Sequence, residues 1–209
     1  MKKLLSAAGL LGISTALAGC DTGFAQAEDI TAQIETEEST IVEKLYAITS
    51  KEASVQSEFE KTLTEDEELS TLKDGSASIF ENIETRQTDL DSLKESSENL
   101  KTHLDELTKI DNEELPNEEL TAVEDNLKTV KSTLDQFIEQ YNGSLEEQEK
   151  YFQSLTAEDA TYQTLESGIE QINGSHAGTN DLLIQLDDQL VQLQTSRTEA
   201  TAALEESQK

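Results

Sequence analysis

Residue types that do chemistry are scarce in this sequence. It holds one cysteine, Cys20, and two histidines, His103 and His176. Di-iron sites in helical proteins need Glu-x-x-His pairs, but Leu100 and Asn173 stand at that spacing before the two histidines. The sequence also lacks a His-Glu-x-x-His zinc motif, a glycine-rich phosphate loop and a nucleophile elbow. We therefore expect a protein that is not an enzyme and that binds no metal or cofactor.

Cys20 itself sits in a pattern with a specific chemistry. The sequence LAGC at residues 17–20 resembles a bacterial lipobox, which implies transfer of a diacylglyceryl group to the cysteine sulfur and cleavage before the cysteine. A basic start at residues 2–3 and an apolar run at residues 4–18 precede it, as in a secretory signal. That run is about 22 Å long as a helix, which is short of the roughly 30 Å membrane core. We predict a signal peptide at residues 1–19 and a lipid anchor on Cys20, because two acyl chains give stable attachment.

Aromatic residues are distributed unevenly along the sequence. Five of the nine lie within residues 137–162. Tyr151 and Phe152 are adjacent, so both cannot face one helical seam, and we expect one or both to be exposed. Together with Tyr162 they are the candidate binding residues, and core packing at the end of a helical bundle is the alternative.

The charge balance limits the partners. The chain has 45 acidic and 15 basic residues, which give a formal charge of −30. Removal of residues 1–19, which contain two lysines, makes the formal charge −32. Nucleic acid and anionic lipid would be repelled by this charge. Adjacent acids such as Glu67 and Glu68 lack the loop geometry of a calcium site, so we interpret them as solvated helix faces.

The elements that must position these residues are long helices. Apolar residues recur at alternating steps of three and four, which places them on one side of a helix. Pro116, the only proline, ends the second helix because it cannot donate to the helical ladder. Thr64 and Thr156, each followed three residues later by an acid, are predicted to cap the starts of the second and fourth helices. The stripe of the third helix is Leu120, Val123, Leu127, Val130, Leu134, Phe137, Tyr141 and Leu145.

Four helices of roughly 36, 46, 38 and 50 residues cannot bury their stripes alone, so they must fold back on one another. We expect an all-α fold: a monomeric four-helix up-and-down antiparallel bundle with coiled-coil-like packing. Two open coiled-coil hairpins and one extended rod are the alternatives. The predicted layout is a signal peptide at 1–19, a lipidated tether at 20–27 and a helical bundle domain at 28–209. Arg86 and Arg197 fall on the seams, where we expect them to pair with carboxylates or to extend their charged ends to water.

Residues 149–173, EKYFQSLTAEDATYQTLESGIEQIN, together with the lipobox and the long-helix pattern, resemble the YkyA-like family of cell-wall binding lipoproteins of Gram-positive bacteria. The resemblance implies an anchored helical bundle outside the cell and a role in wall binding.

We therefore expect a lipoprotein on the extracytoplasmic face of the cell membrane that acts as a structural or interaction module. Its expected partners are the membrane, through the lipid on Cys20, and cell-wall glycan or another surface protein. A sensor module that binds a partner protein or cations is the alternative. With Cys20 at the membrane, the turns near Thr64 and Thr156 should form a tip on the order of 50 Å away, which would display the candidate aromatic residues.

Overall fold

The computed structural model describes residues 18–209; residues 1–17, which hold most of the expected signal peptide, lie outside the described residues. Every regular element from residue 18 onward is an α-helix, which confirms the predicted all-α class. The elements are α1 (Ala18–Glu52), α2 (Val55–Glu65), α3 (Ser70–Asp74), α4 (Ser78–Leu107), α5 (Asn117–Ser154) and α6 (Tyr162–Ser207).

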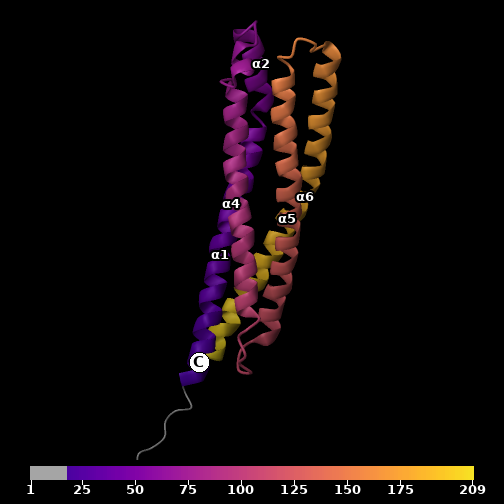
Figure 1. Cartoon of the computed structure of the whole chain (residues 1–209). Helices are drawn as coiled ribbons and strands as arrows, with labels where there is room; N and C mark the ends of the chain where they lie inside the picture. The colour runs from indigo at the N-terminus through magenta and orange to yellow at the C-terminus, as the bar shows by residue number, and fades with distance from the viewer. Residues whose placement is uncertain (1–17) are drawn as a thin grey trace, which may run out of the picture.

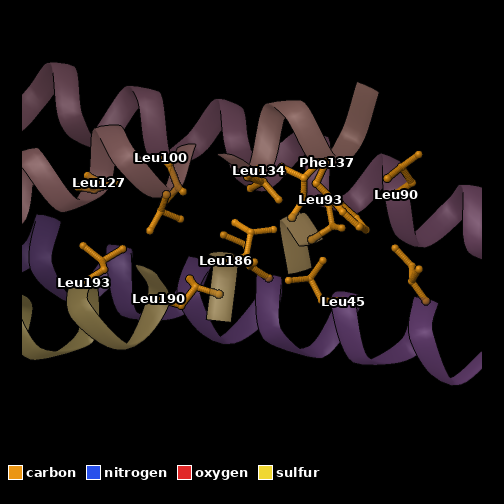
Figure 2. Packing of buried hydrophobic residues seen from close by; sticks show 14 of the residues in the cluster. Leu45, Leu90, Leu93, Leu100, Leu127, Leu134, Phe137, Leu186, Leu190 and Leu193 are labelled. Atoms are coloured by element: carbon orange, nitrogen blue, oxygen red, sulfur yellow. The ribbon is translucent and has the colours of Figure 1, made fainter. Parts of the chain in front are cut away.

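The long helices pack in the pairs α1–α4, α4–α5, α5–α6 and α1–α6. In Figure 1 the chain rises through α1 and α2, descends in α4, rises in α5 and descends in α6. Figure 2 shows leucines of α4 and α5 pointing toward Leu45 of α1 and toward Leu186, Leu190 and Leu193 of α6. The core is therefore a long apolar seam between an α4–α5 layer and an α1–α6 layer.

The stripe predicted for the third helix is confirmed. All eight of its residues, from Leu120 to Leu145, are buried on α5, and α5 begins directly after Pro116, as expected. Alternation by three and four holds because α5 contacts α4 on one side and α6 on the other over most of its length.

The first two expected helices are divided. The first breaks between α1 and α2, where the Lys51 carbonyl accepts from the backbone N–H and the hydroxyl of Ser54. Asn82 of α4 also donates to this carbonyl, at 2.9 Å, and to the Ser54 hydroxyl, at 2.9 Å. The second is preceded by the short α3, which lies between Leu69 at φ 52° and Gly75 at φ 80°. Both residues have left-handed backbones that an α-helix cannot contain.

Both predicted caps are wrong. Thr64 lies in the last turn of α2 and donates to the carbonyl of Glu60, and Thr156 follows α5 and donates to the carbonyl of Gln153. A threonine hydroxyl can bond backward to a carbonyl as well as forward to an N–H, so the motif alone does not distinguish a helix end from a start. The start of α6 is instead capped by Thr161, which accepts from the backbone N–H of Thr164.

The prediction that residues 20–27 form a tether outside the helical bundle is also wrong. Residues 21–27 are part of α1, and Phe24 and Ala27 are buried in the core. Their spacing of three continues the stripe of α1, so burial outweighs the polar neighbours and the glycine. No helix within residues 18–209 has the length and apolar character needed to cross a membrane.

The two seam arginines behave differently. Arg197 of α6 pairs with Glu38 and Glu35 of α1, as predicted, at 3.2 and 3.1 Å. Arg86 of α4 is fully buried and does not reach water. It donates to neutral acceptors only, the side chains of Asn82, Tyr141 and Gln148 at 2.8 to 3.0 Å, so for Arg86 the prediction is wrong.

Candidate binding surface

The predicted aromatic group lies at the end of the molecule where α2, α5 and the start of α6 meet. Tyr151 and Phe152 are 8% and 2% exposed, so the prediction that they are displayed at the tip is wrong. The ring of Phe152 contacts that of Phe59 on α2 at 5.1 Å, and the two rings of residues 151 and 152 contact each other at 5.0 Å. Two adjacent residues are both buried because α5 has a neighbour on each side here: Phe152 faces α2 and Tyr151 faces α6.

Tyr151 is held against α6 by a close backbone approach. A Cβ added to Gly168 would lie 2.0 Å from two ring carbons of Tyr151, so only glycine permits this contact. The Tyr151 hydroxyl donates to the carbonyl of Leu165 at 3.2 Å, and burial raises the pKa of this phenol. Tyr151 therefore fastens α6 to α5 rather than offering a surface to a ligand.

Tyr162, the third candidate, is exposed. It is 78% exposed in the first turn of α6, and Ile169, seven residues on, is also exposed on the same side of the helix. Leu63 of α2 is the remaining large apolar residue exposed at this end. We call Tyr162, Ile169 and Leu63 the distal apolar residues. Their role in binding stays a prediction.

The exposure of Tyr162 and Ile169 has a cause in the fold. The first buried residue of α6 is Thr179, so its first 17 residues contain no buried side chain. His176 pairs with Glu52, the last residue of α1, at 3.2 Å, and α1 offers no partner beyond that level. Above it α2 packs on α4 instead. Leu165 and Ile172 of α6 therefore pack only partly buried against the core, and Tyr162 and Ile169 face solvent.

A shallow groove runs between α5 and this part of α6. Its lining carries hydroxyl, amide and charged groups beside the edge of the Tyr151 ring, from the residues Glu147, Lys150, Tyr151, Ser154, Thr164, Ser167, Gly168 and Gln171. Sequence reasoning missed the groove, because the groove depends on Gly168. In the sequence, a glycine inside a helical pattern indicates only a less stable helix.

The Cys20 end is at the opposite end of the molecule. Gly23, one turn after Cys20, lies against Asn112 of the loop between α4 and α5. Gln208 near the C-terminus donates to Glu28 at 2.7 Å, and Figure 1 places the C-terminus beside the start of α1. The distal apolar residues and Cys20 are thus separated by the length of the long helices.

Among residues 18–209 no three His, Cys, Asp or Glu side chains converge as a metal site would require. His103 is buried on α4, and His176 lies half exposed beside Glu52. Tyr141 donates no proton readily, because burial raises its pKa far above the usual value despite the adjacent Arg86.

Comparison with known proteins gives one match. No curated protein and no solved structure matches the chain significantly. The model of the YkyA family, described as "Putative cell-wall binding lipoprotein", matches residues 24–203, which include every long helix almost completely. The chain therefore belongs to the YkyA family.

Proposed function

We propose that this protein is a lipid-anchored, non-enzymatic module on the outer face of the cytoplasmic membrane, and that it binds the cell wall. The observation that carries the proposal is the family match over residues 24–203, directly after a sequence at 17–20 of lipobox type. Residues 1–19 would be removed as a signal peptide, and Cys20 would become the acylated N-terminus. Residues 28–209, together with residues 21–27 at the start of α1, would act as one up-and-down four-helix domain.

The lipid and the binding surface would lie at opposite ends. Because residues 21–27 continue α1, the lipid would connect to the domain through a helix instead of a flexible tether. The 38 residues of α5 extend about 57 Å at about 1.5 Å per residue. A rod of that length would hold its distal end well clear of the lipid headgroups, where wall polymer is accessible.

The distal end has the chemistry that glycan recognition uses. Tyr162 presents an exposed aromatic ring on which a sugar ring can stack, and Ile169 extends the apolar contact. The hydroxyl and amide groups of the groove between α5 and α6 can exchange hydrogen bonds with sugar hydroxyls. Teichoic acids are a less suitable target, because their negative charge would be repelled by a chain of charge −32.

Co-sedimentation of residues 21–209 with purified wall sacculi tests this proposal. We expect binding that persists after teichoic acid is removed and that needs no magnesium. Replacing Tyr162 and Ile169 by Ala should reduce the bound fraction several-fold without changing the helical circular dichroism. Tyr46→Ala is the matched control, because Tyr46 is 74% exposed but lies on α1. Absence of binding to stripped sacculi would overturn the wall-binding role, and equal losses for Tyr46→Ala and the distal variant would overturn the distal site.

A further inference from the structure

A second group of exposed apolar side chains lies far from the distal end. Val42 and Tyr46 of α1 and Ile184 and Val191 of α6 are each more than half exposed. They are four of the seven large apolar residues exposed within residues 18–209. None contributes to the core, which the same two helices build with their opposite sides.

The contacts between α1 and α6 put these side chains at one level. Glu28 contacts Gln208, Glu38 contacts Arg197, and Glu52 contacts His176, so the two helices run in opposite directions with a fixed register. Val42 follows Glu38 by four residues on α1, and Val191 precedes Arg197 by six residues on α6. Val42 and Val191 are therefore level, and Tyr46 lies one turn further along, toward Ile184.

Helix geometry also puts them on one face. Val42 follows Glu35 by seven residues and Glu38 by four, and both of these glutamates contact α6, so Val42 and then Tyr46 lie on the flank of α1 beside α6. On α6, Ser196 marks the side that contacts α5, through Asn126. At about 100° per residue, Ile184 and Val191 lie roughly 120° to 140° around the helix from Ser196, away from α5. Because α1 and α6 are neighbours in one layer, the four residues form a patch on its outer face, which we call the α1–α6 patch.

The surroundings of the α1–α6 patch are strongly acidic. α6 has eight acidic residues and a single Lys or Arg, Arg197, and this arginine is occupied by Glu35 and Glu38. α1 has eight acidic residues and two lysines, of which Lys44 is held by Asp89 of α4. Glu43 shares Lys44 with Asp89, at the longer distance of 3.9 Å, and the other lysine of α1, Lys51, lies in its last turn. On α6 the exposed carboxylates of Asp181, Asp187 and Asp188 have no Lys or Arg of their own helix except Arg197.

An apolar strip bordered by carboxylates is complementary to a helix with one apolar face and lysine or arginine on its flanks. We propose that the α1–α6 patch is the docking surface for a cationic amphipathic helix of a partner protein. A second copy of this chain fits poorly, because two surfaces of the same acidic charge would be brought together. The proposal is independent of wall binding, which uses the other end of α6.

A model peptide tests the proposed chemistry. The probe is an 18-residue helix-forming peptide of leucine and lysine with leucine on one face, and the control peptide has the same composition in a scrambled order. Titration calorimetry with residues 21–209, which hold the whole described core, is carried out at physiological salt. We expect the amphipathic peptide to bind at least about tenfold more tightly than the scrambled one. Replacing Ile184 and Val191 by Asn should remove most of this difference.

The matched control replaces Tyr162 and Ile169, which are exposed apolar residues of the same helix outside the α1–α6 patch. These changes should leave peptide affinity unaltered, while in the sacculus assay only they reduce binding. Equal affinity for the two peptides would overturn the proposal, because attraction would then be diffuse charge alone. A dimer in sedimentation velocity that the Ile184 and Val191 variant abolishes would also overturn it, since the patch would then be a self-interface.

Discussion

Gly168 is a position where the molecule requires the absence of a side chain. The Tyr151 ring occupies the space a Cβ would need, so Gly168→Ala should lower the free energy of unfolding by about 1 to 3 kcal/mol. Gly174 lies in the same helix with nothing within 4 Å of an added Cβ, so Gly174→Ala should raise it by about 0.5 to 1 kcal/mol. Urea denaturation of both variants measures the difference. Stabilisation by both would mean that Tyr151 does not pack on Gly168.

Asp66, between α2 and α3, should titrate abnormally. Its carboxylate accepts from the backbone N–H of Thr71 at 2.6 Å and from the Thr71 hydroxyl at 2.8 Å, and these bonds lower its pKa to about 2 from 3.8. A carboxyl group whose pKa is lowered by folding stabilises the folded state at pH values above its unfolded-state pKa. This stabilisation is lost as the pH falls from 3.8 towards 2. The destabilisation caused by Asp66→Ala should therefore be present in full at pH 7 and largely lost by pH 2. An unshifted pKa in a carboxyl-detected NMR titration would contradict this.

Single residues show where sequence reasoning was insufficient. The adjacency of Tyr151 and Phe152 implied that one was exposed, but adjacent positions differ by about 100° and can each meet a different neighbour. Arg86 could not be predicted as buried, because its acceptors come from two helices, Asn82 from α4 and Tyr141 and Gln148 from α5. Such partners are fixed only when the helices are placed in space.

At the level of elements, the two parts of α6 differ in burial, and we expect them to differ in stability. Its first 17 residues have no buried side chain, whereas Leu186, Leu193 and Leu204 lie in the core. Opening the first part exposes less apolar surface than opening the second, so we expect amides in 166–178 to exchange with solvent at least about tenfold faster than those in 186–200. Hydrogen exchange followed by mass spectrometry or NMR checks this. Uniform protection along α6 would show that its first part is covered in solution.

Element boundaries were less predictable than element type. The three and four alternation identified the stripe of α5 residue by residue, because a long helix with two neighbours follows its period closely. In α6 the same alternation runs through Tyr162, Ile169 and His176, but these residues are exposed because α1 ends at Glu52. Periodicity reports which side of a helix is apolar and does not report whether a neighbour is long enough to cover it.

At the scale of the whole molecule, the two ends differ in character. The Cys20 end gathers the start of α1, the loop between α4 and α5, and the C-terminus, while the other end carries the distal apolar residues. Composition and periodicity predicted the helical class, and the family match over residues 24–203 confirmed the predicted family. In the proposed arrangement, the direction of the rod relative to the membrane depends on attachment at Cys20.

Fractionation of cells that express the wild-type chain or Cys20→Ser tests that attachment most directly. We predict that the wild-type protein is found in the membrane fraction with the mass of a chain that begins at an acylated Cys20. Cys20→Ser should be either released from the membrane or retained at the full mass of the uncleaved precursor, because TGFAQA and the acidic helices after it offer no other anchor. A Cys20→Ser protein that is cleaved and still bound to the membrane would contradict the lipid-anchored arrangement.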